Sequence, residues 1–204
     1  MKISDYVSCV DFPCVEARQE SYLVPDLEVN PETIKIVLIS ETAATSLADN
    51  YYFTCDALHA RTTLQAFKEA GVTVSNTQDL LRMGIYLTTA VKCGKTDYAV
   101  STSTIVHCSS LLEREIGLFP NVKTFLLMGD VAIKAMNTIA RRQGAPRVIP
   151  AGSTYKIRGG EFSYRGARVF PSYLQAGPSF GIEKSKVRMI AEDIGVALRI
   201  ADIK

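Results

Sequence analysis

The chain has 204 residues, of which 47% are hydrophobic, and a formal net charge of +2. This length is sufficient for one globular domain, spanning residues 1–204, with a substantial buried core. The small net charge excludes a global basic field, so any surface for nucleic acid has to be local. The first residues contain no apolar run of signal-peptide length, and no stretch approaches a membrane span. We therefore expect a cytoplasmic protein that does not associate with membranes.

Three apolar, β-branched stretches without internal Gly or Pro are typical of buried strands in a parallel sheet: Ile34–Ser40, Ile85–Val91 and Val122–Met128. Near the carboxyl terminus, Tyr155–Arg168 alternates around glycines like a hairpin, and Val169–Tyr173 ends a further strand. These strands alternate with segments of helical apolar spacing. The expected helices are Cys55–Ala70, Thr77–Met83, one from about Ser103, one from Gly129 to about Arg142, and Glu183–Ile200. The order predicts a three-layer α/β/α domain with a central, mostly parallel sheet, and places sites at the carboxyl ends of the strands.

Four of the five cysteines form two pairs along the chain. Cys9 and Cys14 precede the first predicted strand, whereas Cys93 and Cys108 bracket the loop after the second one. Cytoplasmic cysteines are not expected to form disulfides, and four thiolates suit an iron–sulfur cluster or zinc. The spacing lacks the two tight C-x2-C knuckles of a zinc ribbon. The alternative is that the cysteines are inert core residues, which is our interpretation of Cys55.

Five blocks, in order along the chain, resemble the iron–sulfur uracil-DNA glycosylases of the wider uracil-DNA glycosylase superfamily. They are the paired cysteines with Arg18 beyond Cys14; Ile36-Val-Leu-Ile-Ser-Glu41, where the family's strand ends in Gly-Glu-x-Pro-Gly; Ile85-Tyr-Leu-Thr-Thr-Ala-Val-Lys-Cys93 with Cys108 following, against a strand ending in Asn-x-Val-Lys-Cys; Leu126-Leu-Met-Gly129 with Ala132; and Ile157-Arg-Gly-Gly160 through Gly166 to Val169-Phe-Pro171. No single block is specific to the family, but the order and spacing of the five blocks are. The resemblance implies a uracil-DNA glycosylase-like fold, DNA as the partner, and a 4Fe–4S cluster on Cys9, Cys14, Cys93 and Cys108, with zinc as the alternative.

The resemblance also implies a chemistry in which the target base leaves the stack and enters a pocket before its glycosidic bond is cut. Glu41 falls on the family's Gly-Glu motif, where a carboxylate would orient water or favour a developing oxocarbenium charge. Phe53 falls at the position of the family's stacking Phe. The alternatives are a helix-capping or solvated carboxylate for Glu41 and a core aromatic near a loop for Phe53.

Two residues that the family uses to bind and release the base are replaced in this chain. The Asn that reads the uracil edge is replaced by Thr89, whose single hydroxyl cannot make the same bidentate pair. The family's His-Pro pair becomes Leu174-Gln175, and Leu174, which would line the base site, has no polar group. The two histidines, His59 and His107, lie on predicted helices outside that loop, and we expect each to be an exposed or a core residue.

The predicted contacts with DNA fall in the C-terminal third of the chain. Arg158 is expected to contact phosphate, and Ser172 and Gln175 begin a loop that would push into the duplex; the alternative is an ordinary polar loop. Basic residues are frequent in this region: Arg141, Arg142, Arg147, Lys156, Arg158, Arg165, Arg168, Lys184, Lys186 and Arg188. A solvated surface explains this frequency equally well.

Together, these patterns predict a divergent DNA glycosylase that hydrolyses the N-glycosidic bond of a deaminated or damaged base flipped out of DNA. The alternative is a catalytically inactive nucleic-acid- or nucleotide-binding module with the same fold, since the base-reading Asn and the His are both replaced. A third possibility is a small-molecule site unrelated to DNA.

Overall fold

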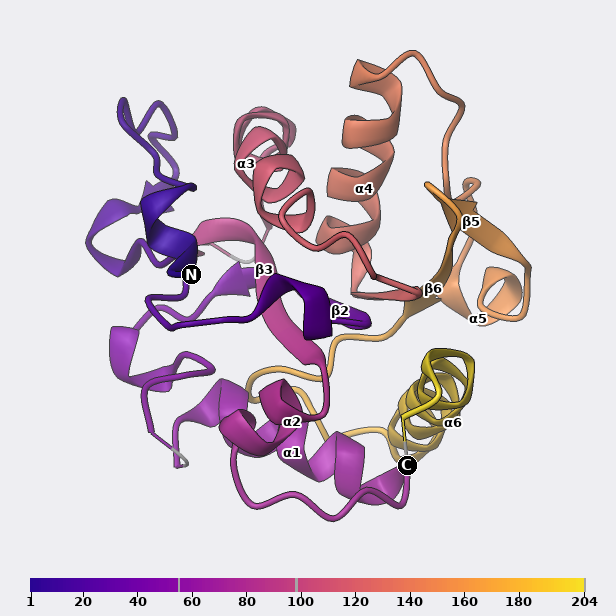
Figure 1. Cartoon of the computed structure of the whole chain (residues 1–204). Coiled ribbons are helices and arrows are strands. Elements are labelled where there is room, and N and C mark those ends of the chain that lie inside the picture. The colour runs from indigo at the N-terminus through magenta and orange to yellow at the C-terminus, as the bar shows by residue number, and fades with distance from the viewer. Residues whose placement is uncertain (55, 98, 204) are drawn as a thin grey trace.

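The centre of the molecule is a six-stranded sheet with the strand order β1-β3-β2-β4-β6-β5 (Figure 1). The computed structural model describes residues 1–54, 56–97 and 99–203. The strands are β1 (Ala17–Arg18), β2 (Ile36–Ala43), β3 (Ile85–Lys95), β4 (Thr124–Met128), β5 (Phe162–Tyr164) and β6 (Ala167–Ser172). The central strands β3, β2, β4 and β6 are parallel, and the edge strands β1 and β5 are antiparallel to their neighbours. The predicted α/β fold with a mostly parallel sheet is confirmed.

Helices cover both faces of this sheet and complete the three layers. They are α1 (Leu58–Glu69), α2 (Thr77–Arg82), α3 (Thr102–Ile116), α4 (Asp130–Arg142), α5 (Thr154–Ile157) and α6 (Lys184–Ala201), with short 3-10 turns at Ile3–Asp5, Gln19–Ser21, Pro31–Thr33 and Leu47–Asp49. Helices α3 and α4 lie on one face, and α1, α2 and α6 lie on the other (Figure 1).

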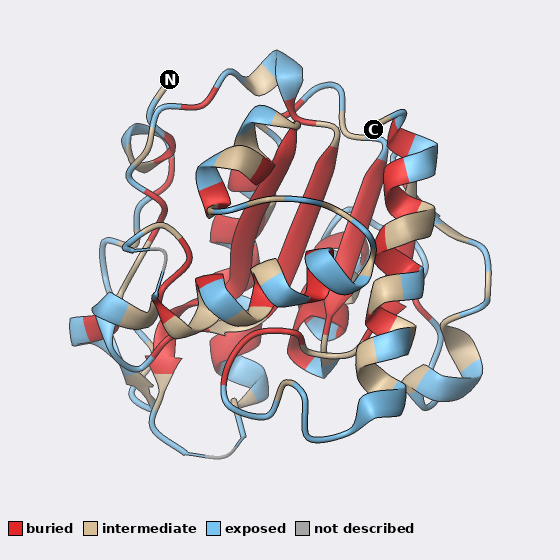
Figure 2. Cartoon of the chain, turned by 90° about the horizontal axis from the view of Figure 1, so that it is seen from below, coloured by how far each residue is buried: buried red, intermediate tan, exposed pale blue. Residues whose placement is uncertain are grey.

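Strand β2 illustrates why the central strands are apolar without alternation. Val37 and Ile39 pack into the core under α3 and α4, whereas Ile36 and Leu38 pack into the core under α1 and α6. All four side chains are 0% exposed. Figure 2 shows the central strands buried along their length, with the exposed surface on the outer sides of the helices. Burial on both faces requires an apolar residue at every position.

Strand β3 extends beyond Val91, where the apolar run ends in the sequence. Strand β1 pairs with the far end of β3, with Ala17 opposite Lys95 and Arg18 opposite Gly94. This pairing continues the strand, so Cys93 lies within β3 and not in the loop after it. The prediction that the strand ends before Cys93 is therefore wrong, because β1 holds the polar end of β3 in the sheet.

The hairpin predicted from Tyr155 onward is only partly correct. Its first part is the short helix α5, and the hairpin itself comprises β5 and β6. Tyr164 pairs with Ala167 across a turn in which Arg165 and Gly166 have φ values of 50° and 81°. Positive φ at both central residues is typical of the tight turns that match the twist of paired strands.

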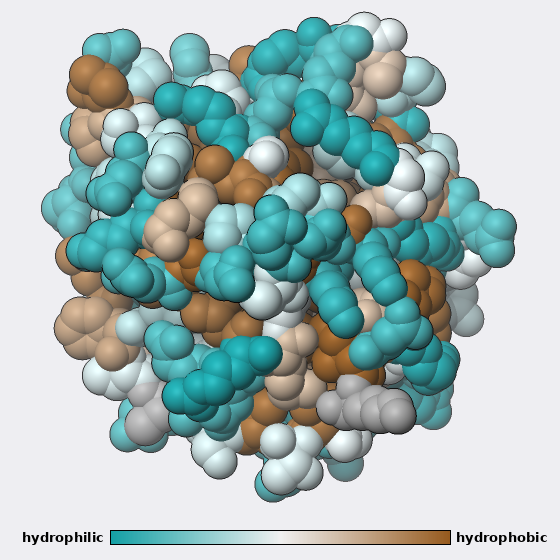
Figure 3. Space-filling view, viewed as in Figure 1, coloured by the Kyte–Doolittle hydropathy of each residue, from teal (hydrophilic) through white to brown (hydrophobic). Residues whose placement is uncertain are grey.

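The surface seen in Figure 3 is largely hydrophilic, and apolar side chains lie on it as separate patches between polar ones. Within the described part of the chain, none of the helices combines the length and apolar character needed to cross a bilayer.

Candidate functional site

Glu41 lies near the carboxyl end of β2, beside the first turn of α4. Its Oε1 accepts a hydrogen bond from the backbone N–H of Val131 at 3.3 Å. Gly129 has a φ of 102°, and a Cβ at this position would stand 2.5 Å from Oε1, so the close approach of Glu41 requires glycine here. One carboxylate oxygen therefore interacts with the start of a helix, as in the capping alternative. The other, Oε2, has no hydrogen-bond partner among the described residues.

A cavity of about 330 Å³ opens beside Glu41, and we call it the Glu41 cavity. His59, Leu174 and the segment Ala176–Ser179 also line it. A neighbouring cavity of about 340 Å³ shares Glu41 and Leu174 and extends towards Lys186. Both cavities lie along the edge where the parallel strands end, which is where open α/β sheets place their sites. A volume near 330 Å³ lies at the lower end of the range of roughly 300–1,000 Å³ for small-molecule pockets.

His59, the second residue of α1, brings an imidazole to this cavity. Burial lowers its pKa to about 4, against the opposing effect of the nearby Asp49 carboxylate. Its Nδ1 is buried without a hydrogen-bond partner among the described residues, and its ring centroid lies 5.5 Å from that of Tyr51. His59 is thus neutral near neutral pH and lines the same cavity as Leu174.

Sequence reasoning set His59 aside because it is distant from that loop along the chain. The available signal was topological. A helix that follows a parallel strand begins at the strand's carboxyl edge, so the first turn of α1 had to lie near the end of β2. The other histidine, His107, is exposed on α3.

A buried hydrogen-bond network fills the space between the end of β2 and the loop after β6. Gln175 is 0% exposed, and its Nε2 lies 3.0 Å from Ser40 Oγ, 2.9 Å from Tyr51 Oη and 3.2 Å from Thr63 Oγ1. The Ser40 and Tyr51 hydroxyls also hydrogen bond to each other. Burial raises the pKa of Tyr51 to about 12. The network joins the loop after β6 to the end of β2, to α1 and to the segment between them.

Tyr51 and Tyr52 occupy the space beside Thr89, the residue predicted to touch the base edge. Thr89 is 6% exposed, and the void that it lines with the two tyrosines has a volume of only about 10 Å³. That volume corresponds to roughly one water molecule. A base could reach Thr89 only if these tyrosines moved. Phe53 is 63% exposed and does not line the Glu41 cavity.

The structure therefore brings together Glu41 and Leu174 from the predicted site, but not Thr89 and Phe53. The roles of all four residues remain predictions.

The side chains predicted to contact DNA are engaged inside the molecule. Ser172 is 0% exposed and donates a hydrogen bond of 2.6 Å to Asp193. Arg158 forms ion pairs with Asp193 at 2.7 Å and with Glu192 at 3.1 Å. Gln175 is buried in the network described above. As DNA contacts, these three residues stay predictions, and Ser172 and Gln175 would have to leave their buried positions.

The two cysteine pairs lie near each other in space. Cys93 on β3 and Cys108 on α3 are each 5% exposed, whereas Cys9 and Cys14, in the N-terminal segment, are half-buried. Burial, with a smaller contribution from the three other thiols, raises the pKa of the Cys93 thiol to about 12. Burial likewise raises the pKa of Cys108 to about 11. In residues 1–54, 56–97 and 99–203, no three His, Cys, Asp or Glu side chains are grouped closely enough to hold a single metal ion. Cys55 lies outside the described residues.

A buried ion pair, which sequence reasoning missed, lies between β3 and α3 beside Cys93 and Cys108. Lys92 and Glu115 are both 0% exposed, and Lys92 Nζ donates to a carboxylate oxygen of Glu115. Nζ also donates to the Thr89 carbonyl at 2.6 Å, and the Tyr86 hydroxyl donates to Glu115 at 2.7 Å. The available signal was a Lys inside an otherwise apolar strand, because Lys is rarely buried unless it is paired.

Comparison with known families agrees with this architecture. Residues 28–187 match the model of the uracil DNA glycosylase superfamily, and the chain belongs to this superfamily. The chain is similar to a type-5 uracil-DNA glycosylase of Thermus thermophilus, with 28% identity over 82 residues. The match covers 40% of this chain and 37% of that protein, so it spans little more than a third of the relative's length. The predicted resemblance to the superfamily is confirmed.

Proposed function

We propose that this protein is a DNA glycosylase that hydrolyses the N-glycosidic bond of a deaminated or damaged base flipped out of DNA. The observation that carries the proposal is the Glu41 cavity, in which a carboxylate and a neutral imidazole lie together at the carboxyl edge of the sheet. Membership in the superfamily supports the reaction class.

Glu41 would act on the sugar side of the reaction. Cleavage of the bond between C1′ and the base nitrogen leaves positive charge on the sugar and negative charge on the departing base. A water molecule then adds to C1′ and releases a proton. The Glu41 carboxylate, with Oε2 free of described partners, would favour the sugar cation, orient the water and accept its proton.

His59 would act on the base side. A neutral imidazole carries one N–H, and this group can donate a hydrogen bond to the negative charge that develops on the departing base. Because burial lowers the pKa of His59 to about 4, the ring keeps this neutral form near neutral pH. Leu174 would supply an apolar wall at the position where the family carries its His.

We further propose that Cys9, Cys14, Cys93 and Cys108 hold a 4Fe–4S cluster, in which four thiolates bind the iron atoms. The donor set fits, because each of the two buried thiols interacts electrostatically with the other three. A cluster spreads its four thiolates further apart than a single tetrahedral ion does. Zinc held by the same four thiolates is the alternative. The four cysteines would join the N-terminal segment to β3 and α3.

The cluster predicts a broad visible absorbance and bound iron in anaerobically purified protein. Cys108→Ser is expected to abolish both, because it removes one of the four thiolates. Cys55→Ser, a cysteine that the proposal does not use, is the matched control and should retain both. Bound zinc without visible absorbance would support the zinc alternative. Protein that contains neither iron nor zinc would refute the proposed metal site.

The glycosylase proposal is tested by incubating folded, cluster-bearing protein with duplexes that contain uracil, xanthine or hypoxanthine. An abasic product from at least one of them is expected. Binding of DNA without an abasic product would instead support the inactive binding module, which the tyrosine-filled space beside Thr89 favours.

A further inference from the structure

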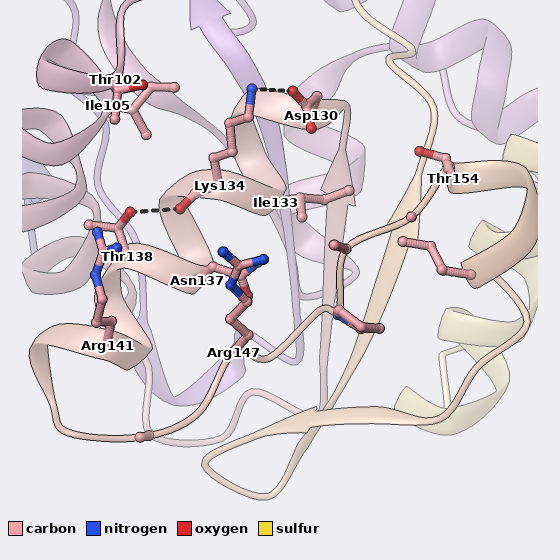
Figure 4. A pocket seen from close by; sticks show the side chains of 15 residues that line it. Thr102, Ile105, Asp130, Ile133, Lys134, Asn137, Thr138, Arg141, Arg147 and Thr154 are labelled. Atoms are coloured by element: carbon pink, nitrogen blue, oxygen red, sulfur yellow. Dashed lines mark hydrogen bonds and ion pairs between the residues drawn. The ribbon is translucent and has the colours of Figure 1, made fainter.

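A third cavity, of about 490 Å³, lies along α4; it shares no lining residue with the Glu41 cavity, but Asp130 and Thr154 also line the neighbouring cavity of about 340 Å³. Its walls are the outer side of α4, the start of α3, the segment 145–154 and α5 (Figure 4). We call it the α4 pocket. Ile105, Ile133 and Ile157 line it from three different helices and give it an apolar surface. Figure 4 shows the ion pair of Asp130 and Lys134 at one end, and Arg141 and Arg147 at the other.

Two arginines line this pocket without an acidic partner among the described residues. Elsewhere in the basic C-terminal third, acidic side chains neutralise several cations, as in the pairs Arg142–Glu113, Arg158–Asp193, Lys186–Glu183 and Arg188–Glu192. Arg141 and Arg147 are exposed and line the pocket, and neither has an ion-pair partner among the described residues. Lys134, by contrast, pairs with Asp130 at 2.5 Å. The uncompensated positive charge is therefore concentrated at one end.

The pocket is held in shape by a bidentate contact between α4 and the segment that covers it. The Asn137 amide donates to the carbonyl of Ile149 at 2.9 Å and accepts from its N–H at 2.9 Å. This contact fixes the path of the loop that carries Arg147. Asp130 and Arg141 are eleven residues apart on α4, or ~16 Å along the helix axis at 1.5 Å per residue. The pocket is thus elongated, and backbone contacts fix the shape of its wall.

We propose that the α4 pocket binds a nucleotide, with the phosphate at Arg141 and Arg147 and the base against the isoleucines. Guanidinium groups bind phosphate oxygens through paired, charge-assisted hydrogen bonds. The apolar surface matches the face of a base, and the oxygens of Asp130 and Thr154 offer acceptors for an exocyclic amino group at the far edge of that base. A ligand that is anionic at one end and planar at the other satisfies both ends of the pocket. The phosphate belongs either to a free nucleotide or to a nucleotide within a single strand.

Titration calorimetry with a free nucleoside monophosphate and with a short single-stranded oligonucleotide tests the site. We expect Arg141→Ala combined with Arg147→Ala to weaken binding of the preferred probe at least tenfold. Lys156 is another exposed cation, on α5, and its side chain does not line the pocket. The affinity of Lys156→Ala for the same probe should stay within twofold of wild type. The probe that binds more tightly identifies the source of the phosphate.

A second variant tests the apolar part of the pocket. Ala151→Trp would fill it without removing charge, and should weaken binding of the nucleotide but not of inorganic phosphate. The proposal is overturned if neither probe binds, if the double variant binds as wild type does, or if inorganic phosphate binds as tightly as the nucleotide.

The site does not rest on the excision reaction, because Glu41 does not line it. Glu41→Gln should slow excision by about 10²–10³-fold and leave nucleotide binding within twofold of wild type, so that failure of either proposal is visible separately.

Discussion

Replacement of Lys92 by Ala is expected to lower the free energy of unfolding by about 3–5 kcal/mol. The substitution would leave the Glu115 carboxylate, which is 0% exposed, without its cation. The hydroxyls of Tyr86 and Thr88 still donate to Glu115, but they supply no charge. An unpaired buried charge is costly, because desolvation is not offset. Urea denaturation measures this loss as a lower midpoint concentration, with an unchanged dependence of the free energy of unfolding on urea concentration.

A surface pair provides the matched control for Lys92. Lys123 lies 2.7 Å from Asp202, with side chains that are 44% and 77% exposed. Because water screens this pair, Lys123→Ala should change the free energy of unfolding far less than Lys92→Ala does. Combining Lys92→Met with Glu115→Leu removes both charges and should recover much of the loss. Equal losses for Lys92→Ala and Lys123→Ala would show that the buried pair does not stabilise the fold.

The fold was predictable because its main signal is local. Strands buried on both faces give unbroken apolar runs, so Ile34–Ser40 and Ile85–Val91 identify a covered parallel sheet. The ends of these strands are polar and were therefore mispredicted. Strand β3 continues to Lys95 because Ala17 and Arg18 pair with it, and that partner lies about 75 residues earlier in the chain.

The site was less predictable because side-chain burial depends on distant partners. Tyr51 and Phe53 belong to one aromatic cluster, and their order along the chain does not show which ring is buried. The Tyr51 hydroxyl bonds to Gln175, 124 residues further on, and Tyr51 is buried, whereas Phe53 is 63% exposed. The pairing of Lys92 with Glu115 likewise joins β3 to α3 across 23 residues.

The catalytic role of Glu41 stays a prediction, but its place near the carboxyl end of β2 could be predicted because the motif Ser40-Glu41 ends a clear apolar run. The structure places His59 in the cavity beside this motif and leaves Glu41 Oε2 without a hydrogen-bond partner among the described residues.

Replacement of Glu41 by Gln is expected to lower the single-turnover rate of base excision by about 10²–10³-fold. Glutamine retains the oxygen that accepts from Val131 N–H, so the contact with α4 and the fold should persist. The neutral amide cannot take the proton from water or favour the sugar cation, which would raise the barrier by about 3–4 kcal/mol. DNA affinity should change little, because the loss concerns the transition state and not the bound substrate.

Two further variants test the division of roles in the Glu41 cavity. Glu69→Gln neutralises an exposed carboxylate at the end of α1 and should excise at the wild-type rate. His59→Phe keeps an aromatic ring beside Tyr51 but removes the N–H, so excision should slow most for bases whose anion is least stable in water. A His59→Phe rate that falls equally for all substrates would assign His59 to packing. An unchanged Glu41→Gln rate would remove Glu41 from the reaction and leave its contact with α4 as its role.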